Sequence, residues 1–205
     1  MSERVLDVVT KKFGDAVLFT HSQFGDDTLV LDPKHWKAVC RFLRDDPAMS
    51  FDMFVDLCGV DYPARVANGG KGRVEVVLHL YSSARRHRIR VKTAVGDEEM
   101  DGCEVDSITD LWPGADWFER ETYDLVGVTF KGHPDLRRIL MYPEFEGHPL
   151  LKDYPADRAQ PLVPYRTEAE AGLPLEKLAP FGPDEGMSFG RHNVMPGPST
   201  NHRED

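Results

Sequence analysis

The segment WFERETYDLVGVTFKGHPDLRRIL, residues 117–140, crowds four ionisable side chains into two helical turns. These are Glu119, Arg120, Glu121 and Asp124. Glu121 and Asp124 lie three residues apart and share one helix face, so they could act as an acid and a base, or bind a metal. A carboxylate metal site on a helix usually includes a histidine three residues after a glutamate. This helix has no histidine, so the metal interpretation is the weaker one.

Ion pairing is the third interpretation of the same cluster. Arg120 and Asp124 lie four residues apart, and Arg137 and Arg138 follow closely enough to fold back onto the helix. A half-buried carboxylate must be paired or lose its charge. The pattern therefore favours structural or interfacial pairing over catalysis. On this interpretation Arg120→Ala should cost about 3–5 kcal/mol, because buried carboxylates would lose their partner.

Two Gly-His-Pro tripeptides follow the cluster and place His133 and His148 in equivalent settings. Glycine permits a positive φ, proline fixes φ, and the residue before proline is pushed to extended geometry. Each tripeptide therefore predicts a rigid corner with a projecting imidazole. A zinc pair is conceivable, but no third or fourth ligand has suitable spacing. Histidines that bond to backbone or carboxylate groups are the favoured interpretation.

The composition narrows the class of protein. The chain has 205 residues and a net charge of −10, which argues against general nucleic-acid binding. No stretch approaches the roughly 18–20 apolar residues of a membrane span, and MSERVLDVVTKKFG lacks the apolar run of a signal peptide. We expect a cytoplasmic chain that meets a membrane only through partners. The three cysteines are scattered singly, as reduced thiols are in that compartment: Cys40, Cys58 and Cys103.

The elements that must position these residues follow from periodicity. Alternating apolar residues predict strands on both sides of a Gly25–Asp27 turn, at 51–62, at 73–83 and at 87–95. The face of the 51–62 strand is expected to carry Phe51, Met53, Val55 and Leu57. Helices are predicted near the N-terminus, after Asp32 and after Asp116, which with Glu119 fits a capping box. The order predicts an α+β fold, an antiparallel or mixed sheet with helices on one face.

The chain changes character after residue 153. Prolines and glycines recur through the remainder, which favours neither helix nor ladder. We expect an α+β domain over 1–153 and an extended, proline-rich arm over 154–205. Apolar residues between the prolines indicate that 155–185 becomes ordered only against a partner, whereas the last residues are expected to be disordered.

The segment ERETYDLVGVTFKGHPDLRRIL, followed by EFEGHPLLKDYP, resembles the signature of the C-type subunit, also called the 30 kDa-type subunit, of proton-translocating NADH:quinone oxidoreductase, respiratory complex I. The family pattern is filled in register by Glu119, Arg120, Glu121, Asp124, Leu125, Val126, His133 and Arg137. The resemblance is strongest over residues 106–155.

The resemblance implies a structural subunit with no catalytic residues and no cofactor of its own. FMN, iron–sulfur clusters and quinone would belong to partner subunits. The chain would lie peripherally on the cytoplasmic face of the inner membrane and pack against the D-type, quinone-site subunit in a hetero-oligomer. The charged helix and the two corners would form a cross-braced platform, and an extended KDYP strand would lead the arm onto the quinone-site subunit. The interface and structural set is completed by Arg138, His148, Pro149, Lys152, Asp153, Tyr154 and Pro155.

Two alternatives remain open. One is the equivalent subunit of a membrane-bound hydrogenase or of a ferredoxin- or F420-linked quinone reductase. The other is a free-standing enzyme that uses Glu121 and Asp124 with His133 or His148.

Overall fold

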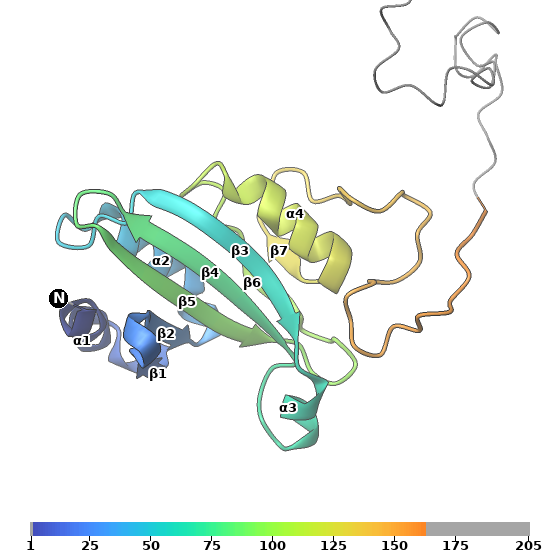
Figure 1. The fold of residues 1–205 in the computed structure, drawn as a ribbon, viewed down its shortest axis with the longest axis horizontal. Coiled ribbons are helices and arrows are strands. Elements are labelled where there is room, and N and C mark those ends of the chain that lie inside the picture. The colour runs from blue at the N-terminus through green and yellow to red at the C-terminus, as the bar shows by residue number, and fades with distance from the viewer. Residues whose placement is uncertain (1, 163–205) are drawn as a thin grey trace, which may run out of the picture. The chain divides into compact units, whose positions relative to one another are not determined.

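The computed structural model describes residues 2–162 (Figure 1). Residues 163–205 lie outside the described residues; they include most of the 155–185 segment expected to become ordered against a partner and the last residues expected to be disordered. The described part contains a five-stranded sheet with the order β1-β2-β5-β4-β3. Its strands are β1 (Val17–His21), β2 (Asp27–Leu31), β3 (Met53–Asp61), β4 (Val74–Ser82) and β5 (His87–Val95).

The sheet is mixed. The pairs β1–β2, β3–β4 and β4–β5 are antiparallel, whereas β2 and β5 run parallel. A second, two-stranded parallel sheet joins β6 (Glu104–Asp106) to β7 (Thr129–Lys131). The α-helices are α1 (Ser2–Lys12), α2 (Trp36–Asp45), α3 (Pro63–Ala67) and α4 (Ala115–Val126), with 3₁₀ turns η1 (Gly14–Ala16), η2 (Gln23–Gly25) and η3 (Pro33–His35). The predicted α+β class is confirmed.

Helices α2 and α4 cover the same face of the large sheet. The apolar stripe of α2 is fully buried in one core with residues of β4, as its periodicity predicts; the helix contributes Trp36, Val39, Cys40 and Leu43. Helix α4 crosses β3 at Gly59, which lies opposite Val76 of β4. A Cβ atom at Gly59 would come within 2.9 Å of the Thr122 methyl group, so a larger residue would push the helix off the sheet. In Figure 1, α4 runs alongside β3.

The apolar face predicted for β3 is wrong at Met53 and Val55, although Phe51, just before the strand, is fully buried as predicted. The pairing with β4 shifts between Phe54 and Asp56, so an extra residue interrupts the alternation. Met53 and Val55 are therefore 53% and 43% exposed, and Phe54 turns inward against Phe118 of α4. Beyond the shift, Leu57 is buried as predicted. A register shift of one residue exchanges the two faces of a strand, which strict alternation cannot anticipate.

Candidate functional site

Helix α4 positions the charged cluster, and it begins earlier than predicted. It starts at Ala115, and its N-cap residue is Gly114, which has no side chain that could hydrogen-bond to the helix. Asp116 therefore lies inside the first turn, and the predicted capping box with Glu119 is wrong. The helix ends at Gly127, whose φ of 91° lets its N–H reach the carbonyls of Thr122 and Tyr123.

Glu119 points into the core instead of capping the helix. Its side chain is fully buried, and Oε1 accepts a hydrogen bond of 2.8 Å from the Ile108 N–H. The other oxygen, Oε2, is buried and has no hydrogen-bond partner within residues 2–162. Burial raises the pKa of Glu119 to about 7, against the opposing effect of the Ile108 N–H. This carboxyl group therefore carries a proton for much of its time at neutral pH.

Asp124 holds the segment after β7 against the helix. Its carboxylate is fully buried, and Oδ1 accepts from Arg138 Nη1 at 2.8 Å. Its Oδ2 accepts three backbone N–H groups at 2.7–3.0 Å from consecutive residues, Ile139, Leu140 and Met141. Burial alone would raise the pKa of Asp124, but these donors outweigh it and lower the pKa below the ordinary value. One ionised carboxylate thus closes a whole chain turn, which we call the Asp124 clasp.

The arginines have different roles. Arg138 reaches α4 as expected, and it also donates to the Gly147 carbonyl at 2.9 Å. Arg137 does not reach the helix, since its guanidinium is exposed and pairs with Asp135 at 2.8 Å. Arg120 donates to the backbone carbonyls of Arg137 and Arg138, at 3.2 and 3.4 Å, and not to a carboxylate. The predicted Arg120–Asp124 pair is therefore absent, because Arg138 and backbone N–H groups already occupy the Asp124 oxygens.

The two Gly-His-Pro corners attach to opposite ends of α4. His133 Nε2 lies 2.9 Å from Asp116 Oδ1, and its Nδ1 accepts from the Asp135 N–H at 3.0 Å. Because Nδ1 is an acceptor, the ring proton is on Nε2 and is donated to Asp116. His148 Nδ1 lies 2.9 Å from the Asp124 carbonyl oxygen.

The second Gly-His-Pro corner explains why residue 127 is a glycine. The His148 ring lies over this glycine so closely that an added Cβ would come within 2.8 Å of its Cδ2 atom. Both corner histidines thus bond to protein groups of α4, one to a carboxylate and one to a carbonyl. Within residues 2–162, no three histidine, cysteine or acidic side chains form a group that could hold a metal ion.

The structure does not assemble Glu121 and Asp124 into an acid–base pair. Glu121 is exposed, whereas every oxygen of the Asp124 carboxylate is engaged in the clasp. A general acid or base must reach the proton of a reacting group, and Asp124 is enclosed. The arrangement therefore serves to fasten chain segments together.

The segment from Pro149 to Pro155 forms turns and bends, so the predicted extended KDYP strand is wrong. Lys152, Asp153 and Tyr154 each contact a different part of the protein instead of pairing with a strand. The Lys152 N–H donates to Asp61 Oδ2 at 2.7 Å, and Asp153 Oδ2 lies 2.9 Å from Arg73 Nη2. Tyr154 stacks on Phe145 with ring centroids 6.1 Å apart.

Asp61 and Arg73, which the sequence analysis missed, anchor this segment to the sheet. They form a two-bond pair of 2.9 and 3.1 Å, and each is at most 4% exposed. Burial opposes the charge on Asp61, but Arg73 and the Lys152 N–H outweigh it and lower the pKa of Asp61. Conversely, Asp61 raises the pKa of Arg73. The only signal in the sequence is a single charge at the end of one apolar strand and at the start of the next.

The clasp, the corners and the Asp61–Arg73 anchor all fall within a segment shared with known proteins. Residues 29–160 match the family model of the respiratory-chain NADH dehydrogenase, 30 Kd subunit. The chain belongs to this 30 Kd subunit family. The match includes α4, both corners and the turn at Tyr154, but not α1 or β1.

Named relatives in the 30 Kd subunit family support the match. The chain is 46% identical over 158 residues to the C-type subunit of the NADH-quinone oxidoreductase of Azorhizobium caulinodans, covering 76% of this chain and 71% of that protein. It is 50% identical over 132 residues to the same subunit of Mesorhizobium japonicum, covering 64% of this chain and 61% of that protein. The chain therefore spans between about three fifths and seven tenths of these relatives.

A solved structure shares the fold of this 30 Kd family member. A chain in the structure of the membrane-bound sulfane sulfur reductase, an archaeal respiratory membrane complex, superposes with a TM-score of 0.62. The overlap covers 76% of this chain and 86% of the other, at 21% sequence identity. At this identity the similarity concerns the fold alone. No helix within residues 2–162 is both long and apolar enough to cross a membrane.

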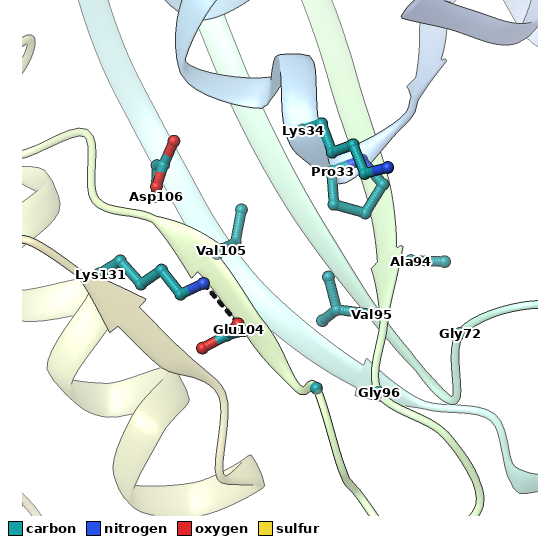
Figure 2. Close-up of a pocket in the computed structure, with 11 residues that line it drawn as sticks. Pro33, Lys34, Gly72, Ala94, Val95, Gly96, Glu104, Val105, Asp106 and Lys131 are labelled. Carbon is teal, nitrogen blue, oxygen red and sulfur yellow. Dashed lines mark ion pairs between the residues drawn. The ribbon is translucent and has the colours of Figure 1, made fainter.

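A cavity of about 430 Å³ lies away from the charged cluster, where η3 and the end of β5 face β6 and β7 (Figure 2). Its walls include Ala94 and Val95 of β5 and the exposed ion pair between Lys131 and Glu104. None of the residues that the sequence analysis singled out lines it. In this member of the 30 Kd family, the cavity and the clasp are therefore separate features.

Proposed function

We propose that this chain is a non-catalytic structural subunit of the hydrophilic arm of an NADH:quinone oxidoreductase. In this proposal it supports the D-type, quinone-site subunit during electron transfer from NADH to quinone coupled to proton translocation. FMN, iron–sulfur clusters and quinone belong to partner subunits, and the chain lies on the cytoplasmic face of the membrane. The Asp124 clasp carries the proposal, because the most polar part of the family signature is used to shape a surface.

Three large apolar side chains on α4 and on the segments that bond to it are exposed. Leu140 donates its backbone N–H to Asp124 and leaves its side chain 57% exposed. Leu150, whose N–H bonds to the Leu125 carbonyl, is 54% exposed, and Trp117 on α4 is 62% exposed. Large apolar side chains held outward on a fixed backbone are typical of a protein–protein interface. We call Trp117, Leu140 and Leu150 the clasp surface and propose that it packs against the quinone-site subunit.

The experiment is a pull-down of the tagged full-length chain from gently solubilised membranes, with mass spectrometry of the recovered proteins. We expect a large quinone-site subunit, iron–sulfur subunits and a flavin-binding NADH subunit. Leu140→Glu should reduce the recovery of the quinone-site subunit at least tenfold, because a charge would be buried in the contact. Ala38→Glu adds the same charge to the exposed side of α2 and should leave recovery unchanged. Recovery of the chain alone, as a soluble monomer, would refute the proposal.

The fold shared with the sulfane sulfur reductase chain supports a second candidate, the equivalent subunit of a related respiratory complex such as a membrane-bound hydrogenase or a ferredoxin- or F420-linked quinone reductase. The higher identities to NADH-quinone oxidoreductase subunits favour the first candidate. The same pull-down separates the two, since a hydrogenase-type large subunit in place of the flavin-binding NADH subunit would select the second.

A further inference from the structure

The turn that joins β4 to β5 carries three exposed basic side chains. We call them the turn arginines: Arg85, Arg86 and Arg88. Figure 1 shows the turn at the end of the sheet opposite α3. None of the turn arginines forms an ion pair within residues 2–162. Further along β5, by contrast, Arg90 lies 3.3 Å from Asp26, and Lys92 lies 2.8 Å from a Glu75 oxygen. The basic charge of this strand is thus neutralised within the chain except at the turn.

Two of the turn arginines are held in place by neighbouring groups. Arg85 Nη2 donates to the Pro47 carbonyl at 3.0 Å, which leaves its other N–H groups free. The Arg88 guanidinium lies 5.8 Å from the centroid of the Tyr81 ring, within the range of a cation–π contact. Side chains that are already ordered lose less conformational entropy when they bind. The turn therefore presents its charges in a preorganised arrangement.

One carboxylate lies at the turn, but its oxygens are engaged. Asp52 accepts the Ser83 N–H at 2.9 Å through one oxygen and the Ser83 hydroxyl through the other, so it holds the turn backbone. A second carboxylate, that of Asp27, is buried and lies 3.0 Å from His87 Nε2. Neither pairs with a turn arginine. The turn thus keeps an excess of positive charge on a chain whose net charge is −10.

Arg86 has a backbone conformation that arginine rarely adopts. Its φ of 52° lies in the left-handed region, which glycine and asparagine adopt most easily. The side chain is exposed, so it adds nothing to the core that would offset this cost. Strained residues persist where the surrounding structure fixes them, and they cluster at functional positions. An arginine at this position therefore indicates a use for its charge outside the chain.

The chemistry of the turn arginines selects the kind of partner. The planar fork of a guanidinium group matches paired oxygens of a carboxylate or a phosphate. Segments that bind anionic phospholipid carry roughly four to eight basic residues, whereas the turn has three and the acidic remainder of the chain would be repelled by such a surface. The same net charge disfavours nucleic acid. An acidic protein surface is attracted only at the turn and repelled elsewhere, so the contact also fixes the orientation of the two proteins.

We propose that the turn arginines dock on a cluster of carboxylates at the surface of a neighbouring protein subunit of the same assembly. This inference rests on the proposed function, because it requires a hetero-oligomer. The turn belongs to β4 and β5, whereas the clasp surface belongs to α4 and the segments bonded to it. The chain then has two kinds of contact, an apolar one at the clasp surface and a charged one at the turn.

The test sets stability against association. The neutral variant, Arg86→Gly with Arg88→Gln, removes two charges and the strain, so the isolated chain should unfold at the same temperature as wild type or higher. Wild type and variant, with different tags, are expressed together at equal levels in the native host, and their ratio is measured in the purified membrane assembly. We expect the neutral variant to be depleted about tenfold or more. The control, Lys11→Gln with Lys71→Gly, removes two exposed charges elsewhere and should be incorporated equally.

A charge-retaining variant, Arg86→Lys with Arg88→Lys, identifies the partner group directly. It should be retained in the assembly, and a carbodiimide should then couple the introduced amines to carboxylates that they touch. Mass spectrometry is expected to find bonds from position 86 or 88 to aspartate or glutamate of another polypeptide.

Three results would overturn the proposal. The first is equal incorporation of the neutral variant, or a depletion that the control shares. The second is that positions 86 and 88 form no bond, or bond only to a second copy of this chain. The third is that the isolated wild-type chain, and not the neutral variant, sediments with phosphatidylserine vesicles while no bond to another polypeptide forms. If wild type itself is not recovered in a larger assembly, the proposed function has failed and this inference with it, a result unlike any of these three.

Discussion

The buried carboxyl group of Glu119 should make the stability of this protein depend on pH in an unusual direction. The perturbation is Glu119→Gln, which keeps an acceptor for the Ile108 N–H and replaces the titrating group by a neutral amide. The folded chain retains the Glu119 proton up to about pH 7, whereas the unfolded chain releases it near the ordinary value of 4.5. The stabilisation is therefore fully present below pH 4.5 and is lost as the pH rises through about 7.

The magnitude follows from the two pKa values. A difference between 4.5 and about 7 corresponds to about 3 kcal/mol of unfolding free energy, at about 1.4 kcal/mol for each pKa unit. Most of it, about 2.5 kcal/mol, should be lost between pH 5 and pH 8. Other groups act elsewhere or with the opposite sign. The lowered pKa values of Asp61 and Asp124 matter only below about pH 4, and burial lowers the pKa of His79, which adds stability as the pH rises towards 6.5.

The assay is urea denaturation of the purified chain at several pH values from 5 to 8, for wild type and for Glu119→Gln. The difference between the two free energies isolates Glu119, since all other titrating groups are shared. We expect the variant to gain about 2.5 kcal/mol relative to wild type over this range. Glu121→Gln is the matched control, because its carboxylate is exposed and its removal should leave the pH dependence unchanged. A constant difference between wild type and Glu119→Gln would refute the argument from burial.

Three further predictions concern the fastening of the α4 segment. Asp124→Asn should lower the unfolding free energy by about 3–5 kcal/mol, because the buried ion pair with Arg138 is lost and the new amide NH2 group must face either Arg138 or the three backbone N–H donors. Urea denaturation measures this loss, and a value below about 1 kcal/mol would contradict the clasp. Gly127→Ala should lower the unfolding free energy by at least about 1–2 kcal/mol, because alanine is strained at this positive φ. The added methyl group should also displace His148 and speed amide hydrogen exchange over residues 147–151; unchanged exchange would count against the contact. Arg120→Ala should lower the unfolding free energy by only about 1 kcal/mol, because the partners of Arg120 are backbone carbonyl oxygens and not a carboxylate. The sequence alone predicted about 3–5 kcal/mol, and a measured loss above about 3 kcal/mol would indicate a buried carboxylate partner after all.

The sequence predicted the features that depend on local periodicity. The helix after Asp32 and the strands β4 and β5 were predicted because their apolar residues repeat at the periods of helix and strand. Asp32 was predicted to cap a helix and does accept the Lys34 N–H at 2.9 Å, although the first turn is the 3₁₀ turn η3. The family was also predicted, because a long signature in register is a linear property of the chain.

Partner choice could not be predicted in the same way. Spacing favours Arg120 as the partner of Asp124 and does not distinguish Arg137 from Arg138, yet only Arg138 reaches the Asp124 carboxylate. Which arginine does so depends on where the chain turns after β7. That turn is held by backbone N–H groups, and because nearly every residue has one, the sequence carries no signal for it. The bulge in β3 is of the same kind, because register is a property of two strands.

By itself, then, the sequence determined the fold class and the family, since both follow from patterns of residues along one chain. Only the tertiary structure decided that Glu119 is buried with its pKa raised to about 7, that Asp124 closes a clasp, and that Asp61 and Arg73, twelve residues apart, anchor Lys152 and Asp153. The physical reason is that burial and hydrogen-bond geometry set the charge state and the role of an ionisable group, and both depend on segments that meet only after folding.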